Sequence, residues 1–508
     1  MNVLDRLPFH FSHAAAEPHV EEAPPSCARR LPTLAALAIA VASSIVLVLA
    51  GCASTNGIAP QATKLDPARI GLTDTSPQPS LATDWWTAFG DATLDGLVER
   101  ALADSPTLKA SQARVERARA SVGSAEANRR PQVNGVANVT REHLSENGIF
   151  PPPLGGATFT LSDVQAQASW DLDLFGRNRA ALEAAIGNEL AAQADRAAAR
   201  LVLSTNVVRT YLQLARFETQ RDVATRALQQ RGETLGLVQQ RVQAGIDTNV
   251  ELRQSEGALP ETRQQIEAFD EQIAIARHAL AALTAQPPEA LGSLAPRLAN
   301  LRNVALPVTV PADLLGRRPD IAAARWRIEA SLQDVAAARA EFYPNVNLTA
   351  FIGLNTIGVS RLLHSGSDEW GVGPAIRLPI FDAGRLRANL RARSADVDVA
   401  VETYNGSVLD AVRDAVDQIS SLKSIDRQRR EQSQASAAAE SAYDLATQRY
   451  RAGIGTYLTV LTAETNVLQQ RRQSADLDAR ALDTQVVLVR ALGGGYADTP
   501  ALTAQASR

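Results

Sequence analysis

Cysteine is nearly absent from this chain of 508 residues: Cys27 and Cys52 are the only two, and both lie near the N-terminus. The rest of the chain therefore has no thiol for a structural disulfide, a cysteine nucleophile or a cysteine-rich metal site. Histidine is also scarce, and its six residues are scattered without the spacing of metal ligands or a catalytic triad. The glycine run at 493–495 follows an expected helix, so it indicates a helix end and not a phosphate-binding loop. These absences argue against an enzyme.

Aromatic residues make up only 5% of the chain, and neither sign of charge dominates, since the formal net charge is −4. Lys and Arg are interleaved with Asp and Glu, which argues against a nucleic-acid partner. Proline is absent from Leu154 to Leu259 and again from Ile380 to Thr499, where Ala, Leu, Arg, Gln and Glu are frequent. This composition favours long helices over a conventional globular core.

The longest apolar run lies close to the N-terminus. Arg29 and Arg30 precede apolar residues from Leu34 to Ala50, and Gly51-Cys52 follows. This pattern predicts a lipoprotein signal peptide over residues 1–51, with Cys52 as the lipid attachment site that carries N-acyl (palmitate) and diacylglyceryl groups, and a lipidated tether over 52–80. The alternative is a transmembrane anchor, because a run of about 18 apolar residues approaches the length of a membrane span. The small residues before a lone cysteine favour lipidation.

The chain contains an internal repeat. Pro106 matches Pro319 and Pro131 matches Pro344, and both differences, 319 − 106 and 344 − 131, equal 213. Later strings also match, FGRNRAAL with FDAGRLRANL and RVQAGIDT with RYRAGIGT. We therefore expect two repeats, 81–300 and 301–496, and a flexible tail over 497–508. Each repeat is expected to run helix, strand, loop, strand, very long helix, glycine turn, long helix.

Residues of alternating polarity predict two strands in each repeat. Their expected ranges are about 132–141, 163–175, 344–354 and 370–381. One apolar and one polar face over about ten residues is typical of a transmembrane barrel with a wet lumen. A soluble sheet with one buried face would show the same alternation, but the lipoprotein signal favours the membrane. Four strands cannot close a barrel, so several copies would have to share it, with extracellular loops at 141–158 and 358–369.

Two helical hairpins are expected at about 180–285 and 385–493. A helix from Leu182 to Val242 would be about 90 Å long, several times the thickness of a bilayer, so this part should stand in water. We expect Pro260 to kink the first returning helix. The second returning helix carries a coiled-coil seam at steps of three and four: Leu458, Leu461, Thr465, Leu468, Arg472, Ala475, Ala479, Leu482, Val486 and Val489.

Several strings resemble one known family, in the expected order from Trp85 to Tyr496: WWTAFGDATLDGLVERALADSPTL, DLFGRNRAALEAA, LLGRRPDIAAAR, IFDAGRLRANL, RYRAGIGTYLTVL and ALGGGY. The chain resembles the TolC-like outer-membrane efflux factors, in the NodT-type lipoprotein branch of RND systems. The resemblance implies a mainly α fold with a membrane β part, in which a homotrimer forms a twelve-stranded barrel and an α-helical tunnel. It also implies a passive, non-enzymatic conduit for drugs or other small molecules, which works with a periplasmic adaptor (membrane fusion protein) and an inner-membrane RND-type transporter.

The resemblance also implies roles for residues at the tunnel tip. Gly245 and Gly453 match the two turns that contact the adaptor, although the helix reversal alone would require glycine. By position, Tyr450 matches the family's gate tyrosine and Leu458 its hydrophobic ring. Thr462 is a further gate candidate, at a position where relatives often carry an acid. The charged residues near the turns are also gate candidates, although each could equally be a solvated surface residue: Asp247, Glu251, Arg449 and Arg451.

Two rivals share part of this evidence. An outer-membrane channel of a type I protein secretion system would have the same architecture with different inner partners. A purely structural periplasmic coiled-coil lipoprotein would have the anchor and the helices without a channel.

Overall fold

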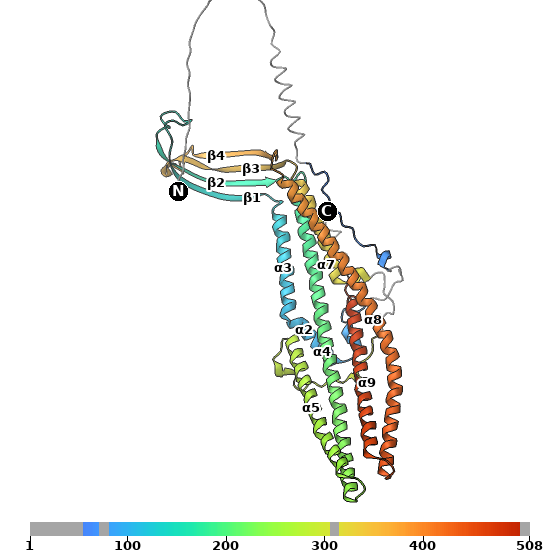
Figure 1. The fold of residues 1–508 in the computed structure, drawn as a ribbon. Helices are drawn as coiled ribbons and strands as arrows, with labels where there is room; N and C mark the ends of the chain where they lie inside the picture. Colours follow the sequence, from blue (N-terminus) through green and yellow to red (C-terminus); the bar gives the residue numbers. More distant parts are fainter. Residues whose placement is uncertain (1–53, 71–80, 305–313, 498–508) are drawn as a thin grey trace, which may run out of the picture. The chain divides into compact units, whose positions relative to one another are not determined.

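The computed structural model describes residues 54–70, 81–304 and 314–497, which belong to one compact unit, Ala53–Arg508 (Figure 1). The predicted signal peptide, Cys52 and all but the first residue of the predicted tail lie outside the described residues. In the described part, no helix combines the length and the apolar character needed to cross a membrane.

The described elements follow the order expected from the repeat. Those of the first half are η1 (Pro67–Ile70), η2 (Trp85–Phe89), α2 (Ala92–Asp104), α3 (Pro106–Ala127), β1 (Gln132–His143), β2 (Thr158–Asp171), α4 (Arg177–Gln243), α5 (Asn249–Leu283), η3 (Pro288–Leu291) and η4 (Leu298–Asn300). Those of the second half are α6 (Leu314–Arg317), α7 (Pro319–Ala340), β3 (Asn345–Ile357), η5 (Val359–Arg361), β4 (Asp368–Arg377), α8 (Arg385–Arg451) and α9 (Tyr457–Ala491).

Three helices of the first half have the same lengths as three helices of the second half. Each half has one helix of 22 residues before its strands, α3 or α7. After the strands, α4 and α8 have 67 residues each, and α5 and α9 have 35 each. Residue numbers therefore differ by 213 before the strands (319 − 106) and by 208 after them (385 − 177 and 457 − 249). At 1.5 Å per residue, α4 is about 100 Å long.

The strands form one antiparallel sheet in the order β1-β2-β3-β4, so β1 and β4 are its edges (Figure 1). Gln167 pairs with Asn134 and with Phe351, and Ala350 pairs with Val372. The predicted strands overlap the observed ones, but three of their ends differ by four or five residues. The second strand was expected to start at about residue 163 and starts at Thr158. The second strand was expected to run to residue 175 and the fourth to residue 381, and they end at Asp171 and Arg377.

The two strands end early because the chain turns into a capped helix. Asp173 has a φ of 50°. Its carboxylate accepts from the backbone N–H of Asn178 and of Arg179, both at 2.8 Å. In the second half, Asp382 accepts from the N–H of Gly384 at 2.9 Å and of Leu386 at 2.8 Å. Each carboxylate accepts from backbone N–H groups at the start of a helix, which have no partner within the helix. Helices α4 and α8 therefore begin there, and the preceding strands end.

The largest buried cluster joins η2 and α2 to α4, α5 and α9. It includes Trp85, Phe89, Leu94, Tyr211, Leu280 and Val486. Asp91 fixes this junction, because it caps α2 through the N–H of Thr93 and also accepts from the Tyr211 hydroxyl at 2.6 Å. On the predicted seam of α9, Leu468 and the aliphatic positions after it are buried within the chain, whereas Leu458 and Thr465 are exposed. Helix α5 continues through Pro260.

Part of the predicted tether is docked on the helices. The backbone N–H groups of Gln61 and Ala62 donate to Asp398 of α8 at 2.7 and 2.8 Å. Asn405 of α8 accepts from the N–H of Leu65 at 2.9 Å. Ile58 is buried in a cluster with residues of α7 and α8. Residues 54–70, called the strap below, are therefore held by α8 instead of hanging free.

Candidate functional site at the helical turns and the sheet

Each long helix reverses at a glycine in the left-handed region. The φ angles are 71° at Gly245 and 77° at Gly453. After each glycine the chain bonds back, since Ile246 N–H donates to Arg241 O at 2.9 Å and Ile454 N–H donates to Arg449 O at 3.0 Å. These bonds satisfy carbonyls that the helix end leaves free. A side chain would be strained at either glycine, so both turns require glycine for a purely local reason.

Three side chains connect the two turns. Arg241, in the last turn of α4, donates to both carboxylate oxygens of Asp247, from Nε at 2.8 Å and from Nη2 at 3.1 Å. Its Nη1 donates to the backbone oxygen of Tyr450 at 2.9 Å, and its guanidinium lies 4.4 Å from the centroid of the Tyr450 ring. The Tyr450 hydroxyl donates to Asp247. Arg241 and Asp247 belong to the first hairpin and Tyr450 ends α8, so this network joins the two hairpins of one chain.

The network changes the acidity of its members. Hydrogen bonds from Arg241 hold the pKa of Asp247 below its ordinary value, and the Tyr450 hydroxyl adds to this effect. Burial raises the pKa of Tyr450, and its bond to Asp247 raises it further. Asp247 is therefore ionised and Tyr450 protonated at neutral pH, which is the pairing that the geometry requires.

A second buried ion pair lies above the turns. Arg231 of α4 approaches Glu464 of α9, with Nε to Oε2 at 3.3 Å, and both side chains are about nine-tenths buried. Its Nη1 also donates to the carbonyl of Ala258 at 3.0 Å and to the Thr262 hydroxyl at 2.8 Å, both on α5. Burial raises the pKa of Glu464, and Arg231 opposes that shift. Arg231 therefore holds three helices together.

Sequence reasoning placed Asp247 and Tyr450 at the turns and missed Arg241 and Arg231. The available signal was position: Arg241 stands one helical turn before Gly245, and Asp247 stands two residues after it. Arg231 gave no comparable signal, because its partners are 27 to 233 residues away along the chain.

The other gate candidates lie outside the network of Arg241, Asp247 and Tyr450. Glu251 completes a capping box with Thr248 at the start of α5, which is a local structural role. Arg449 and Arg451 are exposed and form no ion pair in the described part of the chain. Thr462 is exposed, and its hydroxyl donates to Leu458 O at 2.8 Å. The Leu458 side chain is 62% exposed.

Apolar side chains are exposed around both turns. Exposed fractions are 60% for Ile246, 62% for Val250 and 70% for Ile454. These three apolar side chains are called the tip surface below. Exposed aliphatic residues that gather at two adjacent turns indicate a contact with another protein.

At the sheet, side chains divide by face. On one face, polar residues bond to each other across the strands: Asn138 donates to Asp163 at 3.1 Å, and Glu369 accepts from Asn355 at 3.0 Å. On the other face, large apolar residues are exposed, including Ile352 at 68%, Trp370 at 72% and Val372 at 67%. A sheet with one hydrogen-bonded polar face and one exposed apolar face suits a wall between lipid and water.

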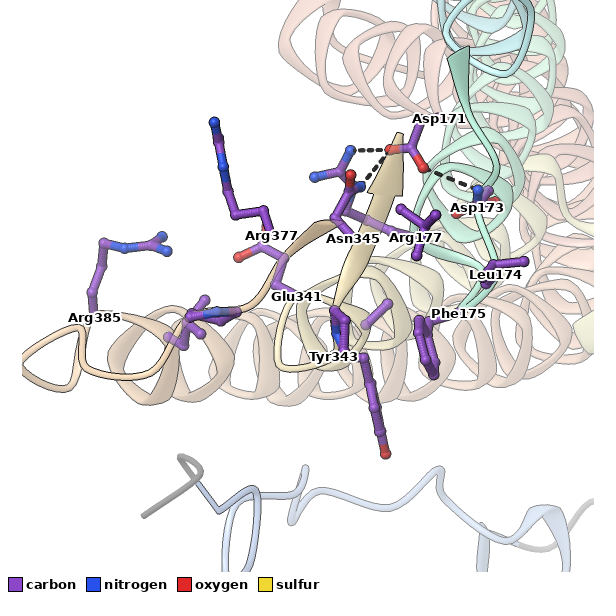
Figure 2. A pocket seen from close by; sticks show the side chains of 15 residues that line it. Asp171, Asp173, Leu174, Phe175, Arg177, Glu341, Tyr343, Asn345, Arg377 and Arg385 are labelled. Carbon is purple, nitrogen blue, oxygen red and sulfur yellow. Dashed lines mark hydrogen bonds and ion pairs between the residues drawn. The ribbon is translucent and has the colours of Figure 1, made fainter. Parts of the chain in front are cut away.

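A pocket of about 350 Å³ lies where the strands meet the long helices (Figure 2). Asp171 accepts from Arg177 Nη2 at 2.8 Å and from Asn345 Nδ2 at 2.7 Å, which ties β2 to α4 and β3. Phe175 and Tyr343 stack with their centroids 4.8 Å apart. Figure 2 shows this pair on the opposite side of the pocket from Asp171. These contacts fix the strands to the helices, and sequence reasoning did not identify them.

Comparisons with known proteins agree with one another. The family model for the outer membrane efflux protein matches residues 97–286 and 310–494. The chain is 36% identical over 377 residues to the fusaric acid resistance protein FusA of Burkholderia cepacia, covering 72% of this chain and 70% of FusA. It is 31% identical over 471 residues to the multidrug resistance outer membrane protein MdtP of Shigella flexneri, covering 89% of this chain and 95% of MdtP. The crystal structure of the outer membrane protein VceC of Vibrio cholerae superposes with a TM-score of 0.76 at 35% identity, covering 81% of this chain and 98% of VceC.

Proposed function

The chain belongs to the outer membrane efflux protein family, and from this membership we propose how it works as a channel: as a trimeric conduit sealed at its helical turns. It is an outer-membrane efflux channel and not an enzyme. The resemblance noted from the sequence is thereby confirmed. The observation that carries the proposal is the four-stranded sheet with two open edges and an exposed apolar face.

Three copies would close the barrel. Unpaired strand edges are not tolerated in hydrocarbon, because each free N–H and C=O would lose its hydrogen bonds. Pairing β4 of one copy with β1 of the next satisfies every edge, and three four-stranded sheets give twelve strands, enough for a water-filled lumen. The polar face, with Asp163, Glu369 and their amide partners, then lines that lumen.

The seal would lie at the turns. Within one chain, Asp247 and Tyr450 already bond to each other, whereas Arg449, Arg451, Leu458 and Thr462 are left exposed. In a ring of copies these exposed residues are available to meet each other. Individual contacts between exposed charges are worth about 0–1 kcal/mol, which suits a seal that has to open.

The tip surface would bind a periplasmic adaptor that connects the channel to an inner-membrane RND-type transporter. Its exposed Ile246, Val250 and Ile454 support a protein contact at Gly245 and Gly453. The names of FusA and MdtP refer to fusaric acid and multidrug resistance, which favours export of small organic molecules over type I protein secretion. The transporter would supply the energy.

A lipid on Cys52 would anchor the N-terminus to the same membrane. Cys52 stands two residues before Ser54, whose carbonyl accepts from Arg387 in the first turn of α8, directly after the sheet.

Planar-bilayer conductance of the purified protein tests the conduit and its seal. We would compare wild type with an Arg449→Ser, Arg451→Ser variant, and use Arg226→Ser, another exposed arginine, as the control. We expect trimers of low conductance in wild type and the control, and severalfold higher conductance in the double variant. Monomers without conductance would refute the channel assembly, and equal conductance in all three proteins would refute a seal at the turns.

A further inference from the structure

The polar face of the sheet contains one aromatic side chain halfway along the strands. One row of the pairing register crosses all four strands there: Asn134, Gln167, Phe351 and Gly371. Trp170 and Trp370 lie on the apolar face, and Phe159 lies at the outer end of β2, paired with Glu142. Within the described strands, Phe351 is therefore the single aromatic ring in the middle of the polar face.

Two glycines of β4 shape the wall beside this ring. A Cβ atom on Gly371 would lie 2.6 Å from Phe351 Cε1 and 2.8 Å from Cζ, so the ring leans over the bare backbone of Gly371. Gly373 is the next residue of β4 on the same face, and a Cβ atom there would meet nothing within 4 Å. The half-buried ring thus covers one glycine and leaves open space above the other.

A carboxylate stands on the other side of Gly371. Glu369 is a diagonal neighbour of Phe351 across β3 and β4, a separation that aromatic and long side chains can bridge. Its Oε2 accepts from Asn355 at 3.0 Å and from Gln165 at 3.4 Å. In the described part of the chain, Oε1 accepts no hydrogen bond and neither oxygen has a basic partner. The carboxylate is therefore oriented by amides and not neutralised.

The rest of this region carries no positive charge. The two rows that flank Phe351 contain neither lysine nor arginine: Val136, Gln165, Gly353 and Glu369 in one row, and Gln132, Ser169, Thr349 and Gly373 in the other. Gln167 donates to Gln165 at 3.1 Å, so the amides bond to each other along the wall. An aromatic ring, an unpaired carboxylate and open backbone are thus gathered in a wall of neutral groups.

We propose that Phe351, Glu369 and the open backbone at Gly373 form a lumenal binding site for planar aromatic cations, present once in each copy. This site names a cargo class for the trimeric conduit proposed above and rests on that proposal. A flat cation can stack on the ring while the carboxylate balances its charge. Stacking depends little on the identity of the partner, because every aromatic molecule has a π face, so one site serves many flat molecules.

The ring could have a purely structural role instead, as a cover for the backbone of Gly371. The two roles differ in what they require of residue 351. A cover needs apolar bulk, which leucine supplies, whereas stacking needs an aromatic ring. Replacement of Phe351 by leucine and by tyrosine therefore separates the two roles.

The experiment measures how long two probes block the open channel in planar bilayers. Ethidium is a planar aromatic cation, and tetraethylammonium is an aliphatic cation of the same charge. We would compare wild type with Phe351→Leu, Phe351→Tyr and Glu369→Gln. Trp370→Leu makes the same kind of change on the apolar face and is the matched control. Fluorescence titration of ethidium with the same trimers in detergent measures affinity without current.

We expect Phe351→Leu to shorten ethidium blocks about tenfold and to weaken ethidium affinity by a similar factor, with no effect on tetraethylammonium. Phe351→Tyr should stay within about twofold of wild type, because tyrosine keeps the ring. Glu369→Gln should shorten the blocks of both cations severalfold, and Trp370→Leu should change neither.

Three results would overturn the site. If Phe351→Leu lowers thermal stability and leaves ethidium blocks unchanged, the ring is only a cover for Gly371. If Phe351→Leu shortens the blocks of both probes equally, the ring does not act by stacking. If Trp370→Leu matches Phe351→Leu, ethidium binds the lipid face. If trimers form and no protein conducts, the conduit fails, and the titration alone decides the site: weaker ethidium binding by Phe351→Leu keeps it, and equal binding refutes it.

Discussion

Asp247 performs several tasks with one carboxylate. It accepts two hydrogen bonds from Arg241 and one from Tyr450, and its side chain is only 11% exposed. Hydrogen bonds to a charged group contribute about 1.5–3 kcal/mol each when the group is shielded from water. The residue therefore holds the first turn closed and fastens it to the end of α8, so both hairpins share one fixed point.

This arrangement predicts a specific response to acid. The pKa of Asp247 is lowered in the folded protein, mainly by Arg241, so its contribution to stability is fully present above the unfolded value of about 3.9 and is lost as the pH falls through the lower folded value. Asp247→Asn should reduce the free energy of unfolding at pH 6 by about 1–3 kcal/mol and have progressively less effect below pH 3.9. Chemical unfolding followed by circular dichroism at several pH values measures this. An effect of Asp247→Asn that is the same at pH 3 and pH 6 would contradict the assignment.

At the scale of elements, helices of equal length bury different numbers of residues: α7 has ten buried residues and α3 has two. The strands show the same principle, because each one carries a polar and an apolar row that a shift of one residue would exchange. Register is fixed by the polar contacts as well as by the apolar row, since Gln165 and Asn355 both reach Glu369 across the sheet. The face on which a residue lies therefore matters more than its position along the strand.

Substitution by arginine should destabilise the protein on the apolar face of the sheet and not on the polar face. Val372→Arg places a charge on the apolar face, near the middle of β4, and should cost about 2–4 kcal/mol of folding into lipid vesicles. Gln167→Arg, at a middle position of β2 on the polar face, is the control and should fold normally. Urea titration of folding into vesicles compares the two. Equal destabilisation by both would show that the apolar face does not meet lipid.

At the scale of the whole molecule, the protein would be attached to its membrane twice, by the shared barrel and by the lipid on Cys52. The strap connects these attachments, because Ile58 is buried between α7 and α8 and Asp398 holds the backbone at Gln61 and Ala62. The strap is thereby held on α7 and α8 and does not behave as a free linker.

Removing the lipid should separate anchoring from folding. Cys52→Ala should abolish labelling by radioactive palmitate and leave trimer formation and membrane association intact, because the barrel remains. Cys27→Ala is the matched control and should keep the label. Labelling that survives Cys52→Ala would show that the lipid is elsewhere, and loss of membrane association would show that the barrel does not anchor the protein by itself.

The sequence alone determined the features that depend on neighbours along the chain: the repeat, the long helices, the glycine turns and the two faces of each strand. Periodicity, proline spacing and the αL preference of glycine act over a few residues, so they can be recognised without a fold. The tertiary structure decided the rest. Arg241 meets Tyr450, 209 residues away, and the strap meets Asp398, 337 residues from Gln61. Such partners are chosen by how helices pack, and strand ends depend on where a helix cap takes over at Asp173 and Asp382, which local periodicity does not encode.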